Sequence, residues 1–184
     1  AAIAVVGAGG VGINAIQGAG LAGAGRVIAV DINPGRLADA RGFGATDGVL
    51  AGPDAGAAIR DLTGGRGVEV AVVTAGSPAA IAAAAGYLAP GGALVVVGML
   101  PTGTTVPYDP TDLAALNQRI LGARMGQAVL ARDIPWLVGE WRRGRLKLAE
   151  LVAGRYPLDE INAAVAASRA GIAGRNIIVF GDAP

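Results

Sequence analysis

The feature that most constrains this chain is the glycine pattern that follows its first apolar run. Residues 2–6 read "AIAVV", and the next six residues are "GAGGVG". Gly7, Gly9 and Gly12 therefore have the spacing G-x-G-x-x-G. In such a turn the first glycine permits a tight passage from strand to helix, the second lets a phosphate approach the backbone, and the third lets the helix pack on the strand. The pattern predicts a strand-turn-helix unit with an anion site at the helix N-terminus.

The chain beyond this turn alternates short Val- and Ile-rich runs with Ala-rich helical patterns. This alternation predicts parallel strands joined by right-handed helical crossovers, and the continuously apolar runs predict a sheet that is covered on both faces. We therefore expect an α/β fold of the Rossmann type, a doubly wound, six-stranded parallel sheet with a C-terminal helical and strand tail. Strands are expected at 2–6, 26–31, 46–50, 68–74, 93–99 and 119–125, and helices at 10–24, 34–42, 54–62, 78–88 and 109–118.

The C-terminal part has a different pattern. An amphipathic helix is expected at 133–143, followed by an extended piece, a further helix and the apolar strand "RNIIVF". We expect a Rossmann domain at 1–147. Residues 148–184 are expected to form a tail that caps the sheet or belongs to a neighbouring lobe.

Composition excludes several kinds of chemistry. With 15 basic and 14 acidic residues the charge is close to neutral, which argues against nucleic acid as a partner. The chain has neither Cys nor His, so it holds no zinc site built on those residues and no Ser-His-Asp or Cys-His relay. Gly and Pro interrupt the long uncharged stretches, so we expect no membrane span. We assign no catalytic residue and no metal ligand, and we expect a cytoplasmic location because the absence of Cys suits a reducing compartment.

An acidic residue supplies the second signal for a ligand. Asp31 ends the second expected strand, about 20 residues beyond the glycine turn. A carboxylate at this place accepts the hydroxyl protons of an adenosine ribose and repels a 2′-phosphate, which favours NAD over NADP. S-adenosylmethionine is the alternative ligand, and capping of the next turn is the structural alternative for Asp31. Six expected strands, with Gly98 ending the fifth, favour the dinucleotide.

The chain as a whole resembles one family. The segments "VVGAGGVGINAIQGAGLAGAGRVIAVDINPGRLADARGFGATD", "LTGGRGVEVAVVTAGSP", "LAPGGALVVVGM", "RILGARMG", "DIPWLVGEWRRGRLKL" and "RYPLDEINAAVAASRAG" follow one another in a characteristic order. In this order they closely resemble the coenzyme domain of zinc-type, medium-chain alcohol dehydrogenases. The resemblance implies the NAD-binding part of an oxidoreductase that transfers a hydride between an alcohol or aldehyde and NAD.

The resemblance also implies cofactor contacts beyond the glycine turn. The strand end at 97–99 matches residues beside the nicotinamide, and the stretch 123–125 matches backbone that holds its carboxamide. Arg36 matches a ribose contact and Arg175 a pyrophosphate contact, with a plain surface arginine as the alternative for each. The expected cofactor-binding residues are Gly7, Gly9, Gly10, Val11, Gly12, Asp31, Ile32, Arg36, Val97, Gly98, Met99, Ala123, Met125 and Arg175.

In this family a catalytic domain that carries the zinc ligands precedes the coenzyme domain. The tail at 148–184 resembles the segment by which the family's chain returns into that catalytic domain. We therefore expect the catalytic domain to lie outside this chain, which by itself binds NAD(H) without turnover. A stand-alone NAD-binding or sensing module and an engineered or truncated domain are the alternatives. A homodimer through an edge strand near Thr102–Tyr108 is also expected from the resemblance, with a plain loop as the alternative for this segment.

Overall fold

The computed structural model describes residues 1–170 and 174–181. The chain divides into two compact units, Ala1–Leu130 and Ala131–Pro184. The division expected from the sequence, after Lys147, places the helix at 130–142 with the first domain, whereas the compact units separate after Leu130, the first residue of that helix. Each unit is described by itself below.

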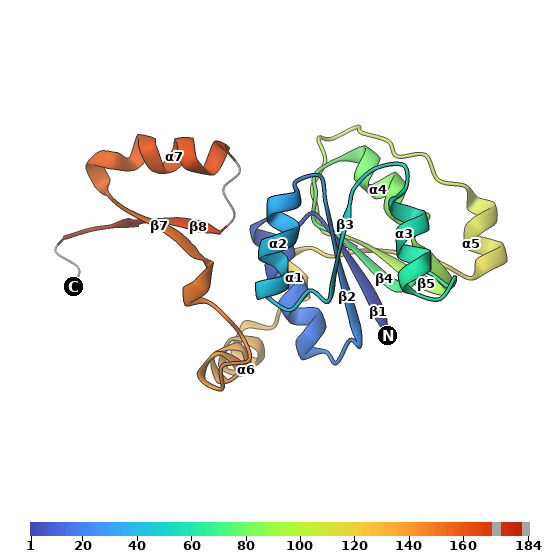
Figure 1. The fold of residues 1–184 in the computed structure, drawn as a ribbon, viewed down its shortest axis with the longest axis horizontal. Helices are drawn as coiled ribbons and strands as arrows, with labels where there is room; N and C mark the ends of the chain where they lie inside the picture. Colours follow the sequence, from blue (N-terminus) through green and yellow to red (C-terminus); the bar gives the residue numbers. More distant parts are fainter. Residues whose placement is uncertain (171–173, 182–184) are drawn as a thin grey trace. The chain divides into compact units, whose positions relative to one another are not determined.

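The first unit contains a six-stranded sheet with the order β3-β2-β1-β4-β5-β6 (Figure 1). Every neighbouring pair of strands is parallel. The expected doubly wound fold is confirmed, because the strand order reverses between β1 and β4, where such sheets bind their ligands. The strands are β1 (Ala2–Val6), β2 (Arg26–Asp31), β3 (Asp47–Leu50), β4 (Val68–Val73), β5 (Leu88–Val96) and β6 (Arg119–Gly122).

Helices cover both faces of this sheet: α1 and α2 lie on one side, and α3 and α4 lie on the other (Figure 1). Two of these helices begin with a side-chain cap followed by proline. Asn33 caps α2 by accepting from the backbone N–H of Gly35, and Ser77 caps α4 by accepting from that of Ala80. Proline suits the first helical position because its missing N–H has no intrahelical partner there. The helices are α1 (Gly10–Leu21), α2 (Pro34–Gly42), α3 (Ala55–Leu62), α4 (Pro78–Ala85) and α5 (Pro110–Leu116).

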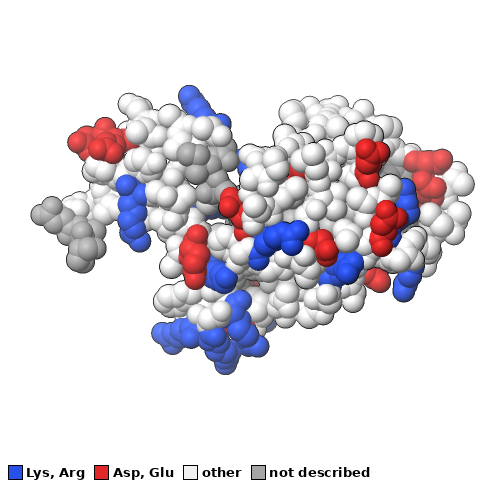
Figure 2. Space-filling model, viewed as in Figure 1, with Lys and Arg blue, Asp and Glu red and all other residues white. Residues whose placement is uncertain are grey.

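The central strands form the core. Ala4 and Val5 in β1, Ile28 and Val30 in β2 and Val73 in β4 are fully buried. Burial on both faces of the sheet explains why these strands are continuously apolar and do not alternate. Figure 2 shows acidic and basic side chains interspersed over the first unit on the face in view, in agreement with the near-neutral charge.

Strand β5 begins earlier than the sequence predicted. The pattern "PGG" at 90–92 indicated a break before a strand at 93–99, but β5 runs through it, from Leu88 to Val96. Leu88 pairs with Val68, and after an irregularity Ala93 pairs with Val70. Gly91, with φ of +75°, takes the left-handed conformation that this irregularity requires.

The segment Thr102–Tyr108 forms no strand, so the expected edge strand there is wrong. Pro101 and Pro107 lack the N–H groups that a sheet ladder needs, and Gly103 has a φ of +85°. The edge beside β5 is formed by β6, which ends at Gly122, earlier than the expected strand end at 125.

The second unit contains α6 (Leu130–Arg142), β7 (Val152–Pro157), α7 (Ile161–Arg169) and β8 (Arg175–Val179). Strands β7 and β8 are parallel, so "RNIIVF" pairs within its own unit. Glu140, which is 2% exposed, accepts hydrogen bonds from Arg143 and Arg145 at 3.0 and 2.7 Å. No helix in the described part of the chain is both long and apolar enough to cross a membrane.

The packing of α1 on β1 is expected to fail in Gly12→Ala. A Cβ at Gly12 would overlap the carbonyl oxygen of Gly7, which is backbone and has little room to move. Overpacking of this kind costs about 3 kcal/mol or more. Gly18→Ala, on the same helix with open space around its Cβ position, is the matched control and should gain about 0.5–1 kcal/mol. Urea unfolding measures both changes, and equal stability of the two variants would contradict the packing argument.

Candidate functional site

The carboxyl ends of the central strands meet along one edge of the sheet. Val6 of β1 pairs with Val30 of β2 and with Val73 of β4, and Val73 in turn pairs with Val96 of β5. Val96 pairs with Gly122 of β6. The residues that follow each of these, from Asp31 to Ala123, therefore lie in one row. Four of the residues expected to bind the cofactor lie in this row, namely Gly7, Asp31, Val97 and Ala123.

The glycine turn is tied to the neighbouring strands. Gly7 has a φ of +96°, and its N–H donates to the carbonyl of Val30 at 2.8 Å. The hydroxyl of Thr74, at the end of β4, donates to the carbonyl of Gly7 at 2.7 Å. A Cβ at Gly7 would lie 2.9 Å from that hydroxyl oxygen, so both the conformation and the space require glycine. Sequence reasoning did not identify Thr74 as part of the turn.

Gly9 differs from Gly7 and Gly12 because neither its backbone conformation nor the space around it requires glycine. Its φ of −78° and ψ of −167° suit any residue, and a Cβ there would have no heavy atom within 4 Å. Gly9 caps α1 without a side-chain hydrogen bond, so the first-turn N–H groups face this open space. The space above Gly9 is therefore a place where an anion can approach the positive end of the helix.

Asp31 connects the second strand to the glycine turn. It is 5% exposed, and its Oδ2 accepts from the backbone N–H of Ala8 at 2.7 Å. Its Oδ1 accepts from the N–H of Asn33 at 2.9 Å, so the structural role of capping the next turn is real as well. The guanidinium of Arg36 lies 3.8 Å from Oδ2. Asp31 thus holds the turn in place, and its charge faces the ligand side of the sheet edge.

A cavity of about 660 Å³ opens at this edge, within the size range of small-molecule sites. Five of the expected cofactor residues line it: Gly7, Gly9, Asp31, Ile32 and Arg36. Its far part is lined by residues that sequence reasoning missed, namely Ala51, Gly52, Pro53, Ser77, Ala79, Ala80, Ala83 and Tyr87. Most are small, and the only signal in the sequence was the density of Ala and Gly in these segments.

The remaining expected residues do not line this cavity. Gly10, Val11 and Gly12 form the first turn of α1. Val97, Gly98 and Met99 follow β5, and a Cβ at Gly98 would overlap the carbonyl oxygen of Ala75. Ala123 and Met125 follow β6, and Met125 has a φ of +51°. Arg175 begins β8 in the second unit.

Candidate metal ligands are not clustered in the described residues. No group of three or more His, Cys, Asp or Glu side chains there could hold a metal ion. The charged side chains that line the cavity are one carboxylate, Asp31, and one guanidinium, Arg36, and such groups suit a ligand with hydroxyl and phosphate groups.

The strand order, the glycine turn at the switch point and Asp31 one strand away define a Rossmann-type dinucleotide-binding domain. The sequence matches the zinc-binding dehydrogenase family over residues 10–140. The chain therefore belongs to this family, and it corresponds to the coenzyme-binding domain of zinc-type medium-chain alcohol dehydrogenases. Binding of NAD(P) follows from this membership.

Two relatives illustrate the match. The chain is 34% identical over 178 residues to a putative alcohol dehydrogenase D of Mycobacterium tuberculosis, covering 95% of this chain and 48% of the relative. It is 35% identical over 161 residues to an NDMA-dependent alcohol dehydrogenase of Amycolatopsis methanolica, covering 86% of this chain and 43% of the relative. The chain spans about half the length of the curated relatives it matches.

Solved structures agree with this assignment. A benzyl alcohol dehydrogenase from Acinetobacter calcoaceticus superimposes with a TM-score of 0.92 at 36% identity. The match covers 98% of this chain and 49% of that one. An alcohol dehydrogenase zinc-binding domain protein from Burkholderia ambifaria gives a TM-score of 0.92 at 38% identity, covering 98% of this chain and 48% of that one.

The residues at the sheet edge fit a dinucleotide. The open space above Gly9 lies at the helix N-terminus, where a pyrophosphate finds N–H donors. The cavity places Asp31 and Arg36 beside an apolar slot of the kind that accepts a nucleoside.

Asp31→Ala is expected to destabilise the domain even without ligand. The substitution leaves the buried N–H of Ala8 without its acceptor, which costs about 2 kcal/mol. Asp39→Ala, an exposed carboxylate on α2, is the matched control and should stay within about 0.5 kcal/mol of wild type. Urea denaturation of both variants gives the comparison, and an unchanged midpoint for Asp31→Ala would refute the structural role of this carboxylate.

Proposed function

We propose that this chain is the NAD(H)-binding domain of an alcohol-dehydrogenase-like oxidoreductase. In the full protein the reaction is the transfer of a hydride between an alcohol or aldehyde and NAD. The observation that carries the proposal is the open space above Gly9 at the N-terminus of α1. The fold leaves that space free although its own packing would tolerate a side chain there.

The proposed contacts follow the row at the sheet edge. The first turn of α1, from Gly10 to Gly12, binds the pyrophosphate, with Arg175 as a further phosphate contact. Asp31 and Arg36 bind the adenosine ribose, beside Ile32. Residues 97–99, after β5, and Ala123 and Met125, after β6, lie beside the nicotinamide and its carboxamide. When bound, the cofactor supplies the hydride acceptor or donor.

The preference for NAD over NADP is proposed on the charge of Asp31. Its carboxylate is 5% exposed and is held by two backbone N–H groups, so it cannot turn away from a ligand at the ribose position. A 2′-phosphate beside it would meet a fixed negative charge in a partly desolvated site. Arg36 lies 3.8 Å from this carboxylate and compensates part of its charge.

No catalytic residue is assigned to the chain, which has no Cys or His for a zinc site. The same observation supports the second candidate function, a module that binds NAD(H) without turning over a substrate. For self-association we propose the edge strand β6, where Ile120 and Leu121 are 45% and 46% exposed. The proposed location is the cytoplasm.

Gly9→Ala tests the proposal directly. The added methyl group occupies the space proposed for the pyrophosphate. NAD⁺ should therefore bind at least about tenfold more weakly, which is a loss of about 1.4 kcal/mol of binding free energy. The unfolding temperature should stay close to that of wild type because the methyl meets no protein atom. Calorimetric titration measures binding, with Gly18→Ala as the helix control. Wild-type protein that gives no heat with millimolar NAD⁺ would refute the proposed function.

Asp31→Ala tests the choice of cofactor. Damage to the turn weakens the binding of NAD⁺ and of NADP⁺ alike. The ratio of the association constant for NAD⁺ to that for NADP⁺ therefore isolates the ribose contact. This ratio should fall about tenfold relative to wild type, because hydrogen bonds to a charged group are lost and a 2′-phosphate is no longer repelled. Asp39→Ala should leave the ratio unchanged. A ratio that stays constant in Asp31→Ala would exclude the ribose role of this residue.

A further inference from the structure

The peptide unit between Gly7 and Ala8 is held at both of its polar ends by side chains from the two neighbouring strands. Its carbonyl oxygen accepts from the hydroxyl of Thr74, which follows β4, at 2.7 Å. Its N–H donates to Oδ2 of Asp31, the last residue of β2, also at 2.7 Å. Strand β1 lies between β2 and β4 in the sheet, so the two side chains reach this peptide from opposite sides.

The surroundings of Thr74 direct its hydroxyl to this carbonyl. Oγ1 also lies 3.2 Å from the carbonyl oxygen of Val6. That oxygen already accepts from the backbone N–H groups of Thr74 and Ala75, at 2.9 and 3.2 Å. The hydroxyl proton therefore goes to the nearer carbonyl, that of Gly7. Branching at Cβ restricts the rotation of a threonine side chain, so this half-buried hydroxyl is held in place at a small entropic cost.

The orientation of the carboxylate of Asp31 depends on this peptide. Oδ1 accepts from the N–H of Asn33 at 2.9 Å, whereas Oδ2 is held by Ala8. A guanidinium nitrogen of Arg36 lies 3.8 Å from Oδ2. Because a peptide unit is planar, a rotation that moves the carbonyl of Gly7 also moves the N–H that follows it. Release of this carbonyl therefore frees Oδ2 to approach Arg36, and a closer pair neutralises more of the charge of the carboxylate.

We propose that Thr74 is a positioning residue for coenzyme discrimination: through the Gly7–Ala8 peptide, it holds the charge of Asp31 toward the ribose and so favours a dinucleotide with a free 2′-hydroxyl. This inference rests on the proposed function, since it takes the ribose at Asp31. Thr74 adds no charge of its own to the site. Its effect on the ligand passes through the peptide, and the glycine spacing in the sequence gives no sign of it.

Thr74→Val removes the hydroxyl and keeps the branched shape. The 184-residue chain is titrated with NAD⁺ and with NADP⁺ by calorimetry. The ratio of the association constant for NAD⁺ to that for NADP⁺ should fall about fivefold, the effect of one net hydrogen bond. Thr74→Ser keeps the hydroxyl and should restore a ratio close to that of wild type. Thr74→Cys has a weak S–H donor and should give an intermediate ratio, which keeps the test available if the valine variant does not fold.

A double-mutant cycle with Asp31→Ala tests whether Thr74 acts through Asp31. Two residues that act through one contact are not additive. Once the carboxylate is absent, Thr74→Val should therefore leave the ratio of the two association constants unchanged. An equal fall of this ratio with and without the carboxylate would show that Thr74 acts on the ligand directly, and it would overturn the inference.

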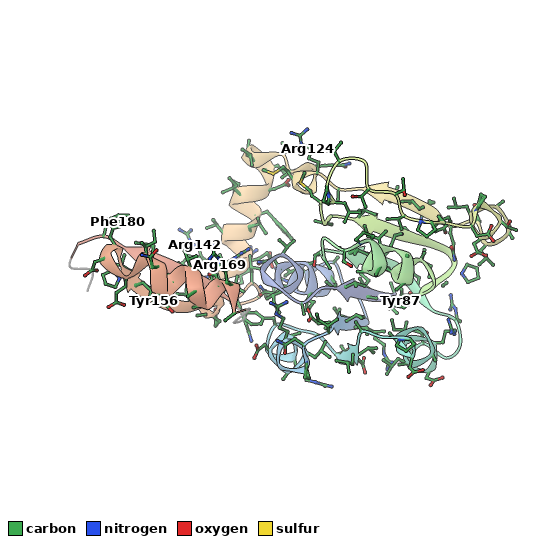
Figure 3. The ribbon with its side chains drawn as sticks, turned by 90° about the horizontal axis from the view of Figure 1, so that it is seen from above. Tyr87, Arg124, Arg142, Tyr156, Arg169 and Phe180 are labelled. Carbon is green, nitrogen blue, oxygen red and sulfur yellow. The ribbon has the colours of Figure 1, made fainter. Side chains whose placement is uncertain are left out.

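Two further variants separate positioning from a loss of stability and from a direct contact. The hydroxyl of Thr63 donates to the carbonyl of Ile59 at 2.7 Å and accepts from the N–H of Gly67 at 2.9 Å, outside the cavity. Thr63→Val should lower the unfolding temperature and leave the ratio unchanged. Tyr87 lines the far part of the cavity from the end of α4 (Figure 3). Tyr87→Phe should change the affinities for NAD⁺ and NADP⁺ by the same factor, as a hydroxyl that does not act on Asp31.

The inference is overturned if Thr74→Val keeps the wild-type ratio of the two association constants. It is also overturned if Thr74→Ser gives the same low ratio as Thr74→Val, because the hydroxyl would then not be the group that matters. Wild-type protein that binds neither NAD⁺ nor NADP⁺ would overturn the proposed function itself. That result is distinct from a wild-type protein that binds its coenzyme with a ratio insensitive to Thr74.

Discussion

The structure of the site depends on how closely α1 packs against the end of β1. Gly12 lies so near the carbonyl of Gly7 that a single added carbon would overlap it. This contact determines where the helix begins and where its first-turn N–H groups point. The direction of α1 follows from it, and so does the place of the helix N-terminus, where we propose that the pyrophosphate binds. Few side chains take part in this contact, so the geometry of the turn depends on the glycines.

Asp31 is the second feature on which the site depends, and its carboxylate has two roles. Its hydrogen bond to the N–H of Ala8 ties the turn to β2, and its bond to Asn33 shapes the entry to α2. The same bonds hold the charge at the position that we propose for the ribose. The side chain proposed to recognise the ligand is thus made rigid by the backbone it supports, which would lower the entropic cost of ordering it on binding.

Much of this could be predicted from the sequence because the relevant signals are local. Apolar runs of strand length, glycines at fixed spacing and an acidic residue at a strand end each act over a few residues, and β1, β2 and α1 lie close to where they were expected. The predictions failed where the pairing of strands, and not the local sequence pattern, determined the secondary structure. Strand β5 extends across "PGG" because Val68 offers a partner for Leu88. The segment at 102–108 forms no strand because Pro107 and the preceding Pro101 lack the N–H donors that a sheet needs.

The sequence by itself determined the fold class, the glycine turn and the place of Asp31, since these depend on backbone conformation and on residues near one another in the chain. Only the tertiary structure decided what surrounds the ligand. Thr74 closes the turn from a strand far away in the sequence, and Tyr87 reaches the cavity from the end of α4. Neither has a motif, because each owes its position to the packing of helices on a sheet whose strand order reverses between β1 and β4.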